Sequence, residues 1–316
     1  MKKFLLKILL LVVLFVILGV PLDICLSRQF KNTTDYRFAV WNDIIDGNMQ
    51  NDIIIMGSSR AWVQISPQIL DSILHISSYN IGIDGSKINR QIPRFKMYCE
   101  RNSKPKIVLQ NVDWGSTLSA NNEKENNYIK EQYFPYFYNR DMRRIVLQEE
   151  NFDFFDLYVP FLRYVRYSNF DRINQILKDV ANPGWDVVKG YKGLERTWDG
   201  SHLRKVDSLY FVYGNESKEY FCQYLQYCKE ENIKVIFVYT PFYIGGTRKV
   251  SNLNDFYSLF DSIANLYDVT ILNYLNDSIC YDTLNFYNAM HLNKTGAEKF
   301  TRILAHDLDS LGVLKQ

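Results

Sequence analysis

A serine and a histidine near opposite ends of the chain have the residue types needed for nucleophilic acyl chemistry. Ser59 follows an apolar run in the sequence Ile53-Ile54-Ile55-Met56-Gly57-Ser58-Ser59, and His291 lies in Asn288-Ala289-Met290-His291, just before a helical pattern. A serine hydroxyl is a weak nucleophile at neutral pH, so it needs a base in contact with it and donors for the oxyanion that forms on a carbonyl. The pair predicts serine acyl-transfer chemistry if folding brings the two side chains together.

Two further segments offer donors for that oxyanion. The short strand predicted at 78–81 leads into a loop that ends at Gly85, where a glycine lets a backbone amide approach a ligand closely. The strand predicted at 106–112 carries Asn111 near its end, which supplies an amide side chain. Because parallel strands end at one edge of a sheet, we expect the backbone amides of Ser59 and Gly85 and the side chain of Asn111 to surround the reacting carbonyl.

Four other side chains are candidates for binding the substrate. Arg60 follows the serine and is suited to an anionic group, although an ion pair with a neighbouring carboxylate is an equal alternative. Trp114, Trp198 and Tyr243 are suited to stacking on a sugar ring or to forming a pocket wall. The alternative for these aromatic residues is ordinary packing in the interior, which an aromatic content of 15% fits equally well.

Strand and helix patterns alternate in the way that is typical of a parallel sheet. We predict five strands, a helix that Ser66 caps and Pro67 begins, and a last helix with one apolar face from about 294 to 311. The predicted strands lie at 52–57, 78–81, 106–112, 233–239 and 270–274. The expected fold is α/β, a flavodoxin-like three-layer α/β/α sandwich.

The alternation stops between about 115 and 205, where the chain is rich in tyrosine and charge and helical patterns occur at 140–149 and 169–181. We predict a mostly helical insertion over the sheet edge. It is either a lid or binding subdomain, or a structural cap without ligand contact. The α/β domain as a whole is predicted at 51–316.

The first residues predict a membrane anchor. Lys2 and Lys3 precede an apolar run from Phe4 to Leu22, which Lys7 interrupts, and its length is close to the roughly 20 residues that a helix needs to cross a bilayer. No small-x-small cleavage site follows the run, which favours retention as an anchor at 1–25 over a cleaved signal. The basic flank places the amino terminus inside and the rest of the chain outside. Residues 26–50 are expected to form a juxtamembrane connector.

Composition excludes some classes of partner. The net charge of +2 gives no electrostatic basis for nucleic-acid binding. The five cysteines are an odd number, and no cysteine or histidine spacing resembles a metal site. We therefore predict neither a metal nor an organic cofactor.

These blocks, in this order, resemble the SGNH hydrolases, the GDSL-like esterase superfamily. Gly57-Ser58-Ser59 is similar to the first block, with Ser58 in place of the usual aspartate. Gly85 is similar to the second-block glycine, Asn111 is the counterpart of the third-block asparagine, and His291 matches the last-block histidine. The sequence around Asn111 lacks the Gly-x-Asn-Asp pattern of that block.

The Gly-Ser-Ser turn, the terminal His-Leu-Asn-x-x-Gly-Ala and the amino-terminal anchor resemble a narrower group, the membrane-tethered SGNH-like proteins of bacterial envelopes. That group includes the D protein of teichoic-acid D-alanylation and the proteins that acetylate exported polysaccharides. The resemblance covers 50–115 and 230–312. It implies a single-pass protein of the bacterial cytoplasmic membrane, with its catalytic domain on the extracytoplasmic (periplasmic) side, working on an envelope glycan beside an integral-membrane acyltransferase.

The main departure from the superfamily is Asn288, where an aspartate usually orients the histidine. Replacing the aspartate of a serine triad by asparagine costs about 10⁴-fold in rate because it favours the wrong tautomer. Three outcomes are open: a Ser59–His291 dyad with Asn288 as a neutral orienter, a charge supplied by Asp282 or Asp84, or a site that binds without turnover.

The function expected is therefore that of a serine esterase or acyltransferase, acting on acetyl esters of an envelope glycan. The alternative is a catalytically silent, glycan-binding accessory protein of the same fold. Binding of a mononucleotide is a third hypothesis, but Gly57-Ser58-Ser59 lacks the glycine spacing and the lysine of a phosphate loop.

Overall fold

The computed structural model describes residues 1–33, 35–118, 127–148, 152–181, 187–201, 203 and 208–313. The chain forms two compact units. The first joins Met1–Asn42 to Lys124–Trp185, and the second joins Asp43–Glu123 to Asp186–Gln316. The second unit holds the sheet and every residue predicted for the site.

The sheet of the second unit has five parallel strands in the order β2-β1-β3-β4-β5, which is the flavodoxin-like order and confirms the predicted fold class. Its strands are β1 (Ile53–Met56), β2 (Ser78–Asn80), β3 (Ile107–Asn111), β4 (Lys234–Tyr239) and β5 (Thr270–Asn273). In the middle of the sheet, Ile55 of β1 pairs with Asn80 of β2 and with Leu109 of β3. The loops that follow β1, β2 and β3 therefore emerge side by side at one edge.

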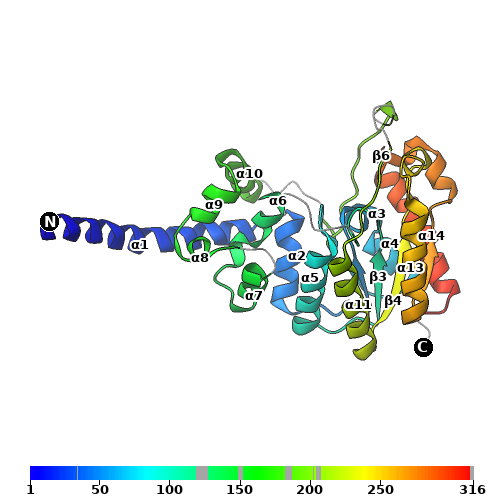
Figure 1. Cartoon of the computed structure of the whole chain (residues 1–316), viewed down its shortest axis with the longest axis horizontal. Helices are drawn as coiled ribbons and strands as arrows, with labels where there is room; N and C mark the ends of the chain where they lie inside the picture. The colour runs from blue at the N-terminus through cyan, green and yellow to red at the C-terminus, as the bar shows by residue number, and fades with distance from the viewer. Residues whose placement is uncertain are drawn as a thin grey trace. The chain divides into compact units, whose positions relative to one another are not determined.

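Helices cover both faces of this sheet, because its strands are apolar on both sides. On one face, Ile53 and Ile55 of β1 share a hydrophobic cluster with Phe300 and Leu304. On the other face, the ring of Phe237 lies 5.6 Å from that of Phe221. Figure 1 shows the strands between α14 on one side and α5 and α11 on the other. The helices are α4 (Pro67–Leu74) and α14 (Lys294–Ser310) on the first face, and α5 (Ile88–Arg101), α11 (Asn215–Glu230) and α13 (Leu253–Tyr267) on the second.

Short elements complete the second unit at the strand ends. Pro67 is the first residue of α4 and Ser66 its N-cap residue, as predicted, although the Ser66 side chain makes no capping hydrogen bond. The short elements are α3 (Ser59–Gln64), α12 (Ile244–Thr247), η3 (Ser278–Tyr281), η4 (Thr283–Asn285), β6 (Phe286–Asn288) and β7 (His291–Leu292).

The first unit is helical. Within it, Figure 1 shows α8 and α9 beside α1, at the point where α1 leaves the unit. Its elements are α1 (Lys2–Lys31), α2 (Tyr36–Asp46, shared with the second unit), α6 (Asn127–Lys130), η1 (Glu131–Tyr136), α7 (Arg140–Gln148), α8 (Phe154–Tyr158), α9 (Leu162–Tyr167) and α10 (Phe170–Ala181).

The structure shows where the residues of the predicted insertion and connector lie. Residues 187–201, predicted within the insertion, fold with the sheet unit, where the amide of Asn80 donates to the carbonyl oxygen of Lys189 at 3.0 Å. The predicted connector at 26–50 is mostly helical, since α1 continues to Lys31 and α2 follows. The helix continues this far because residues 19, 23, 27 and 30, at intervals of four and three, form one buried face of α1 that packs into the first unit.

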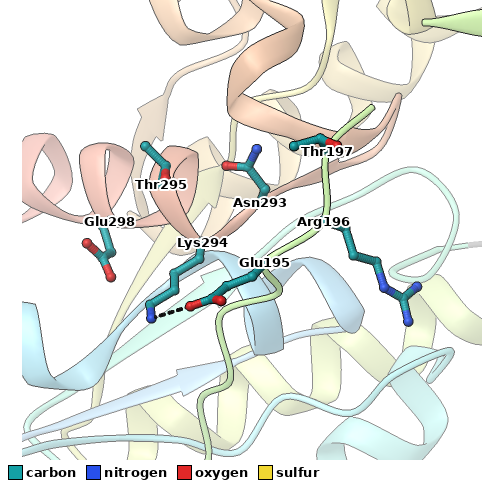
Figure 2. Close-up of a pocket in the computed structure, with 7 residues that line it drawn as sticks. All are labelled: Glu195, Arg196, Thr197, Asn293, Lys294, Thr295 and Glu298. Carbon is teal, nitrogen blue, oxygen red and sulfur yellow. Dashed lines mark hydrogen bonds and ion pairs between the residues drawn. The ribbon is translucent and has the colours of Figure 1, made fainter. Parts of the chain in front are cut away.

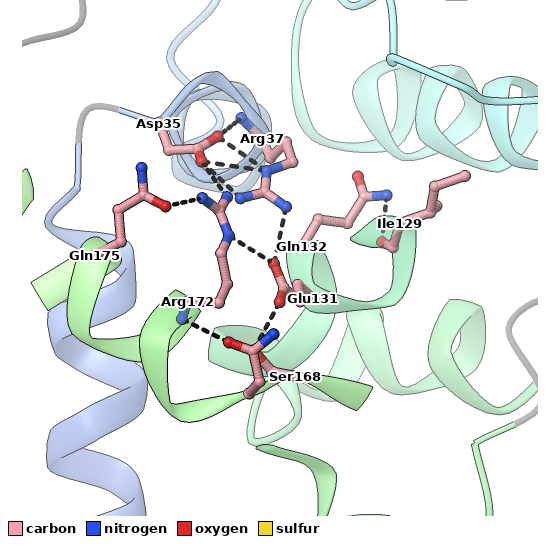
Figure 3. A network of polar contacts seen from close by, with 9 residues as sticks. Asp35, Arg37, Ile129, Glu131, Gln132, Ser168, Arg172 and Gln175 are labelled. Carbon is pink, nitrogen blue, oxygen red and sulfur yellow. Dashed lines mark hydrogen bonds and ion pairs between the residues drawn. The ribbon is translucent and has the colours of Figure 1, made fainter. Parts of the chain in front are cut away.

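A buried ionic network holds the first unit together (Figure 3). Asp35 and Glu131 each bind both Arg37 and Arg172, and the Arg37 Nη1 to Glu131 Oε2 distance is 3.0 Å. The hydroxyl of Ser168 donates to the second oxygen of Glu131 at 2.7 Å. Buried charges are tolerated when they are paired and hydrogen-bonded, as these are.

Candidate active site

A sharp turn after β1 presents the serine. Gly57 has φ +152°, and a Cβ added to it would lie 2.8 Å from the Cβ atoms of both Ala61 and Asn111. Only glycine fits this turn without strain. Ser59 is the first residue of α3 and is partly exposed. Its backbone amide belongs to the first helical turn, whose N–H groups have no partner inside the helix.

A two-stranded hairpin that the sequence reading did not predict presents the histidine. Strands β6 and β7 pair Asn288 opposite His291, with a tight turn between them. Gln64 at the end of α3 donates through Nε2 to the carbonyl oxygen of Met290 at 3.2 Å and so fixes the hairpin to that helix. The Oγ atom of Ser59 lies 2.7 Å from Nε2 of His291. The predicted meeting of the serine and the histidine is thus present in the fold.

The amide of Asn288 sets the proton position on the imidazole. Its Oδ1 atom accepts hydrogen bonds from the backbone amides of Met290 at 2.8 Å and His291 at 2.9 Å, and lies 3.0 Å from His291 Nδ1. Two backbone donors identify this atom as the oxygen, because an NH₂ group there would face two N–H groups. Nδ1 therefore carries the proton and donates it to Oδ1. The lone pair of Nε2 then faces the Ser59 hydroxyl, which is the tautomer that a general base requires.

The imidazole is held neutral. Burial and, as the smaller cause, the positive charge of Arg60 together lower the pKa of His291 from 6.5 to about 3. The residue keeps some solvent exposure, but its ring is enclosed by Ser59, Asn288 and the stacked ring of Tyr287, whose centroid lies 5.2 Å away. At neutral pH His291 is a free base ready to accept a proton.

The two carboxylates considered as substitutes for an orienting aspartate have other roles. Asp282 caps the short helix η4 and accepts a hydrogen bond from the amide of Leu284 at 2.9 Å. The charge of Asp84 acts on Tyr287 and raises its pKa, after the larger effect of burial. Asn288 is the residue that orients His291.

The loop after β2 lies against the nucleophile turn, as expected. The amide of Ile83 donates to the carbonyl oxygen of Gly57 at 3.1 Å, and the amide of Ser86 closes a turn onto Ile83 at 3.2 Å. Gly85 lies in this turn, exposed and with φ +65°. The Gly85 amide therefore lies in a loop that is hydrogen-bonded to Gly57. The role of this amide as an oxyanion donor stays a prediction.

Asn111 does not present its amide at the predicted oxyanion position. The residue is fully buried, and Nδ2 donates to the carbonyl oxygen of Val238 at 3.3 Å and to Oγ1 of Thr240 at 3.2 Å. The side chain thus donates from β3 toward β4 while it packs against Gly57 of the nucleophile turn, a placement that the linear sequence does not reveal.

Two polar residues that the sequence reading did not select connect the loops of the site. The Ser58 hydroxyl donates to Asp113 at 2.6 Å and joins the loops after β1 and β3. The Nδ2 atom of Asn80 donates to the carbonyl oxygens of Ala61 at 2.8 Å and Ile65 at 2.9 Å, which joins β2 to α3. Their position at the carboxyl ends of neighbouring strands was the available signal.

Arg60 is buried and is held by backbone carbonyl oxygens, so its predicted contact with substrate stays a prediction. Its Nη2 atom donates to the carbonyl oxygen of Thr240 at 2.5 Å and to that of Pro241 at 3.2 Å. The guanidinium lies 5.0 Å from the centroid of the Phe242 ring. The side chain points into the domain because α3 turns its second residue toward the segment after β4.

Two of the three predicted aromatic ligands are packed inside the domain. Trp114 is 5% exposed, with its ring 4.2 Å from that of Phe211, and Trp198 is 9% exposed. The ring of Trp198 lies edge-on to that of Tyr243 at 5.1 Å. Neither indole offers an open face to a sugar, so the packing alternative holds for both. Tyr243 is partly exposed and stays a candidate for the pocket wall.

A polar cavity of about 370 Å³ lies at the amino-terminal end of α14, two residues after His291 (Figure 2). Lys294 and Glu195 form an ion pair at 2.8 Å across its floor, and Arg196 points away from that pair. Burial and the charge of Asp84 raise the pKa of Tyr287, and the charge of Arg196 partly opposes this rise. Arg196 is therefore within electrostatic reach of the ring that stacks on His291. The lining residues are Glu195, Arg196, Thr197, Asn293, Lys294, Thr295 and Glu298.

The part of the chain that the structure describes contains no group of three or more histidine, cysteine, aspartate or glutamate side chains placed to hold a metal ion. The five cysteines are free thiols.

Comparison with known proteins gives similarity at the level of solved structures. Known protein families and curated proteins contain no match to the chain. A protein assigned to the G-D-S-L lipolytic family from Desulfitobacterium hafniense is 12% identical, with a TM-score of 0.42, over 81% of this chain and 99% of its own. A protein assigned as an acylhydrolase from Bacteroides fragilis is 12% identical, with a TM-score of 0.40, over 87% of this chain and 96% of its own. Values this low do not bear on function, which has to be argued from the site itself.

Proposed function

We propose that the protein is a serine esterase or acyltransferase of the SGNH type. One observation carries the proposal: the Ser59 hydroxyl, the His291 imidazole and the Asn288 amide form a continuous chain, with contacts of 2.7 Å and 3.0 Å. A nucleophile in contact with a base, and a base in turn oriented by a third group, is the arrangement that serine acyl transfer requires.

The geometry supports the following reaction. The Oγ atom of Ser59 attacks the ester carbonyl carbon while its proton passes to Nε2 of His291. The negative charge on the carbonyl oxygen is stabilised by the backbone amides of Ser59 and Gly85. The intermediate then expels the alcohol, which takes the proton back from Nε2 and leaves an acyl group on Oγ. Water or an acceptor hydroxyl attacks this acyl-enzyme, with His291 again acting as the base.

For the substrate we propose an acetylated glycan of the bacterial cell envelope. The resemblance to membrane-tethered envelope proteins supports this assignment, as does α1, the one helix among the described residues that is long and apolar enough to cross a membrane. The polar cavity at the start of α14 offers charged and hydroxyl groups for a hydrophilic substrate. In this proposal the chain is a single-pass protein of the cytoplasmic membrane with its α/β domain outside, and an integral-membrane acyltransferase supplies the acyl group.

The second candidate is a glycan-binding accessory protein without turnover. The neutral orienter favours it, because Asn288 offers no charge to the imidazolium that forms during attack. The tautomer fixed by the Met290 and His291 amides argues for the first candidate. The two candidate functions predict opposite results in one labelling experiment.

That experiment is labelling of the full-length protein in detergent with a fluorophosphonate probe, which reacts with activated serines. We expect the parent protein to be labelled and the Ser59→Ala and His291→Ala variants to be unlabelled. Ser58→Ala is the matched control, because that hydroxyl is buried against Asp113 and should not react. An unlabelled parent would favour the accessory protein, and label retained in Ser59→Ala would place the nucleophile elsewhere.

Hydrolysis of an acetylated oligosaccharide against hydrolysis of a simple aryl ester then tests the substrate. Because aryl esters are intrinsically more reactive, the result that rejects the glycan is hydrolysis of the aryl ester with no hydrolysis of the acetylated oligosaccharide, which would leave the serine chemistry in place.

A further inference from the structure

The apolar part of α1 matches the thickness of a bilayer and ends where the first unit begins. The run from Phe4 to Leu22 has 19 residues, which at 1.5 Å each span about 28 Å, close to the roughly 30 Å of the hydrocarbon layer. Its large apolar side chains from Phe4 to Leu18 are exposed, and the first buried residue of the helix is Gly19. The outer surface of a membrane crossed by α1 therefore lies near Gly19 to Asp23.

The junction between α8 and α9 lies at this same level. A Cβ added to Gly19 would come within 3.1 Å of the side chain of Pro160, so the two residues are in close contact. The amide of Phe161 donates to Oδ2 of Asp23 at 2.7 Å, and Arg163 forms a buried ion pair with the same carboxylate. These contacts fix α8 and α9 against the last apolar turns of α1.

The ion pair also argues that α1 stays attached. Cleavage near residue 25 would remove Asp23 and leave Arg163, which is 1% exposed, without its carboxylate. A buried charge that loses its partner strongly destabilises a fold.

Helix α8 exposes an aromatic surface next to this junction. Phe154, Phe155 and Tyr158, here called the aromatic edge, are 66%, 57% and 52% exposed. The rings of Phe154 and Tyr158 pack together at 4.5 Å, and the guanidinium of Arg143 lies 5.3 Å from the Tyr158 ring. Aromatic rings beside a basic group are typical of the layer where lipid headgroups meet acyl chains, and contiguous apolar patches are uncommon on surfaces that face water.

We propose that the aromatic edge lies in the interfacial layer of the same bilayer that α1 crosses, so that the first unit rests on the membrane surface. The inference rests on the membrane crossing by α1 that the proposed function includes, and it is independent of the serine chemistry. The partner is the lipid bilayer, because Gly19 and Asp23 hold α8 and α9 at the height where the apolar run ends. An amphipathic surface of this kind enters about 5–10 Å into the boundary between headgroups and acyl chains.

Quenching by brominated lipid tests the proposal on the full-length protein. The protein is reconstituted into phosphatidylcholine and phosphatidylglycerol vesicles, with or without bromine near the headgroup end of the acyl chains. Phe155→Trp introduces a reporter in the aromatic edge, and Phe154→Trp is a second reporter in case the first disturbs folding. Subtracting the parent emission removes the contribution of the native tryptophans.

Phe170→Trp is the matched control in the same unit. Phe170 is 77% exposed and begins α10, whose Arg172 binds Asp35 just beyond the end of α1. The carboxyl end of α1 at Lys31 lies 12 residues past Gly19, about 18 Å further along the helix axis. The control therefore has the same chemistry as the reporter and is also well exposed, at a greater distance from the bilayer.

We expect bromination to remove much of the emission added by Phe155→Trp and to leave that added by Phe170→Trp unchanged. Equal emission with and without bromine at both positions would overturn the proposal. Equal quenching at both would also overturn it, because the aromatic edge would then have no special depth. A blue-shifted but unquenched signal at Phe155→Trp would indicate a protein partner in place of lipid.

Discussion

Replacing Asn288 by aspartate should convert the neutral orienter of His291 into a charged one. In the present structure Oδ1 of Asn288 lies 3.0 Å from Nδ1 of His291 and accepts from two backbone amides. Aspartate has the same shape and keeps an oxygen at that place, so all three hydrogen bonds are preserved. The change therefore adds a negative charge beside the imidazole with little rearrangement.

The size of the effect follows from the distance. Two unit charges 4 Å apart attract by about 4 kcal/mol at the effective dielectric of a protein, which corresponds to about three pKa units. The pKa of His291 should then rise from about 3 to about 6. Desolvation of the new carboxylate removes part of this gain. If about half is realised in the transition state, kcat/KM for ester hydrolysis rises about 10- to 100-fold.

The gain is smaller than the roughly 10⁴-fold that separates aspartate from asparagine in a serine triad, because most of that difference comes from the wrong tautomer. Here the amides of Met290 and His291 already fix the right one.

The assay is the pH dependence of kcat/KM with an aryl ester, for the parent and for Asn288→Asp. For the parent, the base is deprotonated above pH 3, so activity should persist well below pH 6. For Asn288→Asp the acid limb should move upward by two to three units, a range set by the same charge interaction. Asn288→Ala is the control, because it removes Oδ1 and should lower activity. An unmoved acid limb, or a folded Asn288→Asp protein with reduced activity, would refute the reasoning.

Four further predictions concern stability. Gly57→Ala should destabilise the fold by about 3 kcal/mol in chemical denaturation, since its Cβ overlaps two neighbours at φ +152°. Ser58→Ala should lower stability by about 1–2 kcal/mol by removing a donor to Asp113, and an unchanged melting temperature would contradict the contact. Trp198→Ala should lower stability by about 3–5 kcal/mol, whereas a ligand-stacking role would reduce binding with the melting temperature unchanged. Because the pKa of His291 is lowered on folding, protonation favours the unfolded chain below about pH 6.5. The parent should thus lose about 1–2 kcal/mol more than His291→Gln between pH 7 and pH 5.

The sheet was predictable because its signal is local. Most of the five strands are short apolar runs between turn residues, with the polar β2 as the exception, and the observed bounds lie within one or two residues of the predicted ones. The meeting of Ser59 with His291 was predictable for a related reason: both lie next to elements whose ends a parallel sheet brings together. The position of a residue that directly follows a strand can therefore be predicted from the sequence.

Residues placed by a helical turn or by distant packing could not be assigned in this way. Arg60 and Asn111 both lie next to the nucleophile turn, yet both point inward, because the carbonyl and hydroxyl groups of Val238, Thr240 and Pro241 accept from them. Those acceptors are about 180 and 127 positions away along the chain. Trp198 was ambiguous for the same reason, since nothing near it in sequence shows that Tyr243 covers it.

The polar residues of α1 illustrate a third limit. Asp23 and Ser27 follow an apolar run and indicate a connector when they are read in order along the chain. In the structure Asp23 pairs with Arg163, and the Ser27 hydroxyl lies 3.0 Å from that of Tyr164. These contacts stabilise the part of α1 that continues for more than one turn beyond the apolar run. A buried polar face is recognised only once its partners are known, and those partners are over 130 residues away.

Arg60 links the stability of the domain to the reactivity of the site. Its guanidinium satisfies two carbonyl oxygens after β4, and its charge is one of the two causes that lower the pKa of His291. The same charge opposes the imidazolium that forms when Ser59 attacks, and Asn288 supplies no negative charge to offset it. The imidazole is therefore always available as a base, but it is a weak one. A weak base limits the attack step, and the acidic imidazolium that it forms readily returns its proton to the poorly acidic alcohol that leaves a sugar ester.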